Sequence, residues 1–360
     1  MYAKLYTSKA KWRWRSMSDN SRKNEGYSIK GYVPSSAFDE ISSPETLDTS
    51  TIEPEIENMQ TAPQRRGSWW VSSLWTLIYV IMFVLSQAVA TVIVMGVVAA
   101  RGFALGISDG SINLENQDSI DLFIDSLIAT QLPLNVPWIM LGSFLLALLL
   151  CWLVAKLRKF DMRKHAGLNP TRAAVVFVAL FAGIGFSMTF NAFFNMPGME
   201  HFQDPDTQLA QSLLLGSIFT AIVASTIVPI VEEVIFRGFI LNELRRGFAL
   251  IPSMLISSLI FGILHGTAAW ALVAAVLGLA MAWIALRTRS VYPAIAAHAG
   301  VNGASFTFVW LEPSEMSTFV MLLIIGFTLF AAMMVLLTRD SKPLSSLEPA
   351  PEPLPKGTNR

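Results

Sequence analysis

The sequence predicts an all-α, polytopic membrane protein, a transmembrane helical bundle of about eight spans with both termini cytoplasmic. Three observations predict this class. Of the 360 residues, 53% are hydrophobic and 14% are charged, whereas a soluble domain is about 45–50% apolar and about 25% charged. Apolar segments long enough to cross a bilayer recur along the chain. The charges in the connections between them alternate in sign.

The two ends of the chain lack apolar segments. Residues 1–67 are rich in Ser, Glu, Asp, Lys and Asn, and residues 340–360 are rich in Pro, Ser and Glu. Such compositions bury too little apolar surface to offset the entropy lost on folding. We therefore expect a disordered cytoplasmic tail at 1–67 and a disordered Pro-rich tail at 340–360.

Eight apolar segments lie between the tails. They span about residues 69–100, 134–155, 173–195, 209–231, 251–265, 268–286, 291–311 and 317–338. A transmembrane helix needs about 20 residues, so most segments are long enough and the fifth is short. Trp69, Trp70 and Trp75 at the first entry are typical of an interfacial aromatic belt.

The charges in the connections support the same topology. Basic residues precede the first segment and follow the second, fourth, sixth and last. They are Arg65, Arg66, Lys156, Arg158, Lys159, Arg163, Lys164, Arg172, Arg245, Arg246, Arg287, Arg289, Arg339 and Lys342. The alternate connections carry mainly Asp and Glu, with Arg101 as their only base. Because basic loops remain cytoplasmic, eight crossings with both termini inside satisfy the positive-inside rule at each connection.

The first outer connection contains a predicted amphipathic helix. Its apolar side chains recur at helical spacing opposite its acidic ones. The apolar set is Ile120, Phe123, Ile124, Leu127 and Ile128, and the acidic set is Asp118, Asp121 and Asp125. We interpret this segment as a short helix on the outer surface of the membrane, with a packing role favoured over a gating role.

Three short polar stretches interrupt the apolar segments: residues 232–237, 261–265 and 298–302. Ionisable groups inside a bilayer are costly and are usually functional. At 1.5 Å per helical residue, Glu232, His265 and Asn302 lie about 20 Å from the cytoplasmic end of their segments, and His298 about 14 Å. Because these depths are similar, we expect the three stretches to form one site.

The first stretch divides its two glutamates between two roles. Glu233 and Arg237 are four residues apart, so they share a helix face and can pair. Glu232 is turned by about 100° from Glu233 and points elsewhere. We therefore predict a structural Glu233–Arg237 ion pair and a free Glu232. Pro229 also predicts a break in the helix, whose free carbonyls would line a cavity.

The second and third stretches repeat the four-residue spacing. On a helix, Phe261 lies against the His265 imidazole, and His298 and Asn302 present two donors side by side. A further histidine, His165, falls in a basic loop, where we expect it to be solvated.

These side chains suit hydrolysis of an amide bond by water. A carboxylate with a neighbouring imidazole can deprotonate water, and a second imidazole with an amide can stabilise the oxyanion of a tetrahedral intermediate. No serine or cysteine occupies an equivalent constellation. The alternative is a catalytic zinc held by Glu232, His265 and His298. The sequence has no His-Glu-x-x-His pattern, and Asn302 has no obvious role as a zinc ligand.

The sequence resembles the type II CAAX prenyl endopeptidase family, also called the CPBP or Abi family of intramembrane proteases. The resemblance rests on three ordered motifs: Glu232-Glu233-x-x-x-Arg237, Phe261-x-x-x-His265 and His298-x-x-x-Asn302. It covers roughly residues 208–306 and implies an eight-helix fold with endopeptidase activity. By resemblance, Glu232 and His265 activate water, and His298 and Asn302 form the oxyanion hole. Members are often described as metalloproteases, so the resemblance leaves the use of zinc open.

The resemblance divides the chain into five parts. They are the tail at 1–67, N-terminal transmembrane helices with an outer amphipathic loop at 68–207, a CAAX protease-like catalytic core at 208–306, the last transmembrane helix at 307–339 and the tail at 340–360. We expect a multi-pass protein of the cell membrane that needs no cofactor, with zinc as the alternative. Its expected partners are the lipid bilayer and a membrane-associated protein or peptide substrate, with no nucleic acid.

Two other functions fit the same polar stretches. A non-catalytic membrane scaffold or bacteriocin-immunity protein would retain the motifs for structure. A proton-coupled transporter would use Glu232 and His265 as a proton relay. Such transporters are commonly built from inverted repeats, and no inverted repeat is detectable in the sequence.

Overall fold

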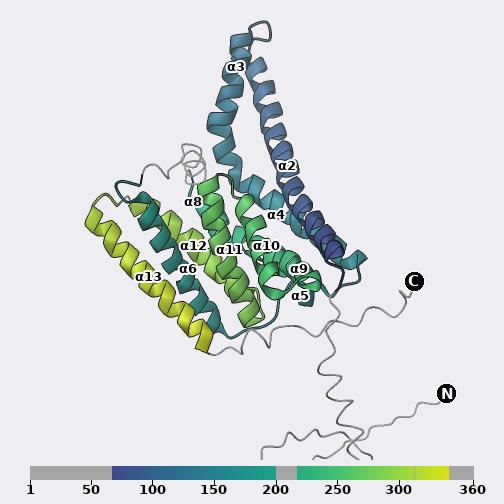
Figure 1. Ribbon diagram of the computed structural model, residues 1–360. Coiled ribbons are helices and arrows are strands. Elements are labelled where there is room, and N and C mark those ends of the chain that lie inside the picture. The colour runs from purple at the N-terminus through teal and green to yellow at the C-terminus, as the bar shows by residue number, and fades with distance from the viewer. Residues whose placement is uncertain (1–66, 200–216, 312, 340–360) are drawn as a thin grey trace, which may run out of the picture. The chain divides into compact units, whose positions relative to one another are not determined.

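The computed structural model describes residues 67–199, 217–311 and 313–339, and all regular secondary structure within these ranges is helical (Figure 1). The predicted all-α class is therefore confirmed. The predicted tails fall outside the described residues, except for Gly67 at the end of the first tail. The predicted outer connection before the fourth apolar segment lies largely outside them as well.

The long helices match the predicted apolar segments in order. They are α2 (Trp69–Ser108), α4 (Leu132–Leu157), α6 (Ala173–Asn195), α8 (Ile218–Glu233), α10 (Leu250–Ile263), α11 (Ala268–Thr288), α12 (Tyr292–Leu311) and α13 (Met316–Arg339). Shorter elements are α3 (Gln117–Ser126), the π-helix η3 (Leu127–Gln131), α5 (Met162–His165), the π-helix η5 (Val234–Ile240) and α9 (Leu241–Gly247).

Six helices or continuous helical runs in the described ranges are long and apolar enough to cross a membrane. They contain α2, α4, α6, α8, α11 and α13. This finding confirms a multi-pass membrane protein. The helix α10 has 14 residues and is shorter than a span, and α12 is not among the six. Eight crossings and two cytoplasmic termini therefore stay predictions.

The first two helical runs are longer than predicted. The amphipathic helix forms as α3, where the Asn116 side chain accepts a hydrogen bond from the Asp118 N–H. It does not end there, because η3 joins it to α4 in one run of 41 residues, Gln117–Leu157. The helix α2 has 40 residues, or about 60 Å. It ends before Gly110, whose φ of 79° is a left-handed conformation that favours glycine.

The run formed by α8, η5 and α9 lies at the centre of the main hydrophobic core. Its aromatic side chains contact helices on two sides. Phe236 meets Phe83 of α2 at a ring-centroid distance of 5.4 Å and Phe261 of α10 at 5.0 Å. Phe239 meets Tyr79 of α2 at 5.3 Å. This packing fixes the helix that carries the first polar stretch.

An ion pair with a buried glutamate ties the end of α4 to α9. Arg158 donates two hydrogen bonds to Glu243, at 2.9 and 3.2 Å, in the bidentate geometry that suits guanidinium and carboxylate. The guanidinium also lies 3.8 Å from the centroid of the Trp75 ring. The end of the central helical run is therefore held by residues from α2 and from the segment that follows α4.

Small residues bring α6 and α12 into close contact. A Cβ atom added at Gly183 would overlap the backbone carbonyl of Ala297, and one added at Gly300 would overlap that of Leu180. Small residues of this kind allow transmembrane helices to approach closely. Because Ala297 precedes His298, this contact also places the third polar stretch.

We predict that Gly183→Ala lowers the free energy of unfolding by about 1–3 kcal/mol, because the added Cβ overpacks the contact with α12. Thermal unfolding of the purified protein in detergent measures the change. Gly96→Ala is a matched control, since a Cβ there meets no atom within 4 Å. Equal melting temperatures for the two variants would contradict the close contact.

Candidate active site

The predicted helix break at Pro229 is absent. Pro229 lies inside α8, which continues to Glu233, and the hydrogen-bonding pattern changes only where η5 begins. Pro229 has no N–H to donate to the Ser225 carbonyl. The Asn302 amide of α12 donates to the neighbouring Ala224 carbonyl at 2.8 Å.

The predicted ion pair between Glu233 and Arg237 is present at the start of η5. Arg237 Nε lies 3.1 Å from Glu233 Oε2, and both side chains are 0% exposed. Arg237 Nη2 donates to the Gly278 carbonyl of α11 at 3.1 Å, and the guanidinium lies 4.4 Å from the Phe261 ring centroid. The pair therefore joins η5 to α10 and α11. Short π-helical segments of this kind occur frequently at functional sites.

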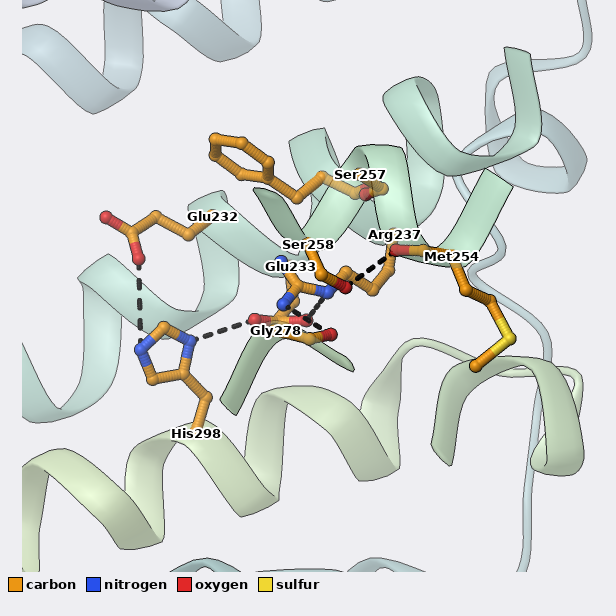
Figure 2. Close-up of polar contacts among 9 residues, drawn as sticks. Glu232, Glu233, Arg237, Met254, Ser257, Ser258, Gly278 and His298 are labelled. Carbon is orange, nitrogen blue, oxygen red and sulfur yellow. Dashed lines mark hydrogen bonds and ion pairs between the residues drawn. The ribbon is translucent and has the colours of Figure 1, made fainter. Parts of the chain in front are cut away.

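His298 lies between the two adjacent glutamates, one on each ring nitrogen (Figure 2). A hydrogen bond of 2.9 Å joins Nδ1 to Glu233 Oε1. Nε2 lies 3.8 Å from Glu232 Oε2, which is too long for a direct hydrogen bond. Glu232 Oε2 is buried and has no hydrogen-bond partner among the described residues. Glu233 therefore bridges Arg237 and His298, while Glu232 faces the other side of the ring.

His265 joins this site through Phe261. The predicted ring contact is present, with centroids 4.3 Å apart, and the Phe261 ring also lies 5.8 Å from that of His298. The His265 Nδ1–H donates to the Phe261 carbonyl at 2.6 Å, which leaves Nε2 available. In the described part of the chain, neither a hydrogen bond nor an ion pair joins His265 to Glu232.

The position of His265 differs from the prediction. It was expected inside an apolar helix, whereas α10 ends at Ile263 and His265 lies in the following turn with an exposed side chain. The last carbonyls of a helix have no helical donor, and the imidazole supplies one to Phe261. The turn therefore both exposes His265 and fixes its ring.

Two contributors to the site were missed by sequence reasoning. The Ser257 hydroxyl of α10 donates to the Phe236 carbonyl within η5 at 3.3 Å, and the backbone of Gly278 binds Arg237. The adjacent Ser257 and Ser258 in an apolar segment are a signal that could have found the first, because polar side chains in such helices often bond across to a neighbour. A backbone carbonyl leaves no such signal.

The prediction that His165 is solvated is wrong. Its side chain is 7% exposed, and its ring stacks on Phe160 with centroids 4.6 Å apart. Burial, followed by the charges of Arg246 and Arg158, lowers the pKa of His165 to about 3. Neighbouring aromatic residues bury it within a basic loop, so it is neutral near pH 7 and lies away from the Glu232 site.

The three expected zinc ligands do not come together as one metal-binding group in the described residues. They are Glu232, His265 and His298, and no three His, Cys, Asp or Glu side chains in the described ranges form such a group. The Nδ1 atoms of His298 and His265 bind Glu233 and the Phe261 carbonyl, respectively, so only their Nε2 atoms are free to bind a further group. We therefore route no chemical step through a metal.

The fold and this site define a class: a multi-pass helical membrane protein with a buried carboxylate–imidazole site of the kind that can activate water. Residues 211–304 match the family model of the type II CAAX prenyl endopeptidase Rce1-like proteins. The chain therefore carries a domain of this family, and all three motifs lie within the matched residues. The resemblance seen in the sequence is confirmed.

A relative in Bacillus subtilis (strain 168) is named "Putative membrane peptidase YdiL". It is 33% identical over 140 residues, which are 39% of this chain and 54% of that protein. The aligned region thus spans about half the length of this relative. No solved structure matches the chain. The matched family and this relative are both described as peptidases.

We predict that Arg237→Ala lowers the free energy of unfolding by about 3–5 kcal/mol, because it leaves the Glu233 carboxylate buried without its partner. Arg101→Ala is the control, because Arg101 is exposed and surface substitutions change stability by about 0.5 kcal/mol or less. Denaturant or thermal unfolding in detergent compares the two. Similar losses in both variants would contradict the role of the buried pair.

Proposed function

We propose that the chain is an intramembrane endopeptidase, which hydrolyses a peptide bond of a membrane-associated protein or peptide with water activated by Glu232. One observation carries this proposal. The Glu232 carboxylate is buried, its Oε2 has no hydrogen-bond partner in the described ranges, and it faces His298 Nε2 at 3.8 Å. A buried carboxylate with a free oxygen beside an imidazole suits a general base.

The proposed reaction needs no covalent intermediate. Glu232 takes a proton from water, and the water oxygen forms a bond with the carbonyl carbon of the substrate. His265, with its free Nε2, assists Glu232. The C–N bond then breaks, and the proton taken from water passes to the leaving amine.

The oxyanion of the tetrahedral intermediate is assigned to His298 and Asn302. Asn302 uses one N–H on the Ala224 carbonyl, and its amide group has a second N–H to donate. Preorganised donors such as this Asn302 N–H are worth about 2.7–4 kcal/mol each in comparable oxyanion holes. Burial strengthens them, because the local dielectric constant is low.

The substrate and the location follow from this chemistry. A site on α8, α10 and α12 of a membrane bundle reaches peptide bonds that lie at or within the bilayer. We therefore propose a membrane-associated protein or peptide as substrate and the cell membrane as location, with no nucleic-acid partner.

We predict that Glu232→Gln and His265→Ala each lower the cleavage rate of a membrane-anchored reporter peptide by about 100-fold or more, the usual range for a lost general base. The assay uses purified protein in lipid vesicles, with equal protein confirmed by immunoblot. Glu115→Gln is the matched control, because Glu115 is exposed and far along the chain from the motifs. Wild-type turnover by Glu232→Gln would contradict the role of Glu232, and no turnover by the wild type would favour the non-catalytic scaffold.

We also predict that active, purified protein contains much less than one zinc per chain. Elemental analysis by mass spectrometry measures the content, and the reporter assay with and without a chelator measures the dependence. One tightly bound zinc per chain, together with inhibition by the chelator that added zinc reverses, would replace this mechanism with a metal-dependent one.

A further inference from the structure

We infer that Glu233 is a positioning residue, which fixes the ring of His298 so that Nε2 faces Glu232. The catalytic consequence rests on the proposed function, whereas the ring orientation does not. Sequence spacing assigned Glu233 only to Arg237. The structure adds a second partner, because the two carboxylate oxygens bind different groups: Oε2 lies 3.1 Å from Arg237 Nε and Oε1 lies 2.9 Å from His298 Nδ1.

The pairing with Arg237 decides which ring nitrogen of His298 carries hydrogen. A carboxylate paired with a guanidinium is ionised, and an ionised carboxylate only accepts hydrogen bonds. The 2.9 Å contact therefore requires a hydrogen on Nδ1. In the neutral ring, Nε2 is then the acceptor nitrogen, and it is the one that faces Glu232.

The positioning unit is rigid because its members are anchored on several helices. Glu233 and Arg237 are both fully buried. Arg237 also donates to the Gly278 carbonyl and lies over the Phe261 ring. A carboxylate held in this way cannot swing to follow the imidazole, so the imidazole adopts the orientation that the carboxylate sets.

This orientation gives the reacting water two acceptors. A water between Glu232 Oε2 and His298 Nε2 meets an acceptor atom on each side. The proton that Glu232 takes from water can pass to Nε2, which then donates to the oxyanion and finally to the leaving amine. Without Glu233, the ring is free to place its hydrogen on Nε2 or to rotate away from Glu232.

The first test reads the ring directly and needs no substrate. The chain contains four histidines, so 15N-histidine labelling gives a sparse NMR spectrum, and His298→Gln identifies the signals of His298. We expect a protonated Nδ1 and an unprotonated Nε2 in the wild type near neutral pH, and loss of this single pattern in Glu233→Gln. A dominant Nε2–H form in the wild type would overturn the inference.

The second test is a double-mutant cycle on the reporter assay. We expect Glu233→Gln to lower kcat by about 10- to 100-fold, the range seen when an orienting partner is removed, with KM within about twofold of wild type. In the His298→Gln background, Glu233→Gln should cause no further loss. Losses that multiply in the double variant would mean that Glu233 acts independently of His298 and would overturn the inference.

Glu243→Gln is the matched control for this cycle. Glu243 is also a buried glutamate paired with an arginine, but it contacts neither His298 nor Glu232. Its effect should therefore be equal in the wild-type and His298→Gln backgrounds. Full turnover by Glu232→Gln would refute the proposed function alone, whereas an Nε2–H tautomer with Glu232-dependent turnover would refute the positioning role alone.

Discussion

The buried pair of Glu233 and Arg237 is the constraint on which the site depends. Two opposite charges without exposure to solvent are stable only when they are paired and their remaining polar atoms are bonded. Glu233 and Arg237 pair with each other and also contact Gly278, Phe261 and His298, which lie on three different helices. One electrostatic requirement therefore brings α10, α11 and α12 together around η5.

Much of this arrangement could be predicted from residues four apart. The ion pair between Glu233 and Arg237 and the contact of Phe261 with His265 follow from helical geometry within one segment. Composition alone indicated the membrane class, and the order of the motifs indicated the family. These predictions succeeded because they depend on helical spacing, on the composition of the chain or on the order of the motifs. None of them requires knowledge of how the helices pack.

The rest could not be predicted, because it depends on contacts between helices. Nothing in the spacing of residues 298–302 indicates that His298 bonds to Glu233, since the two residues belong to α12 and α8. Pro229 predicted a break, but α8 continues through it to Glu233. His165 looked like a loop residue, but aromatic neighbours from other segments bury it. Packing overrode the local signal in each case.

The contact between Arg158 and Glu243 crosses the boundary of the family match. Glu243 lies inside the matched residues 211–304, whereas Arg158 and Trp75 lie outside them. A fragment cut at the match would leave the Glu243 carboxylate without Arg158 at the end of its central helical run. A fragment that keeps this ion pair must therefore include residues from the N-terminal helices as well as the motif-bearing core.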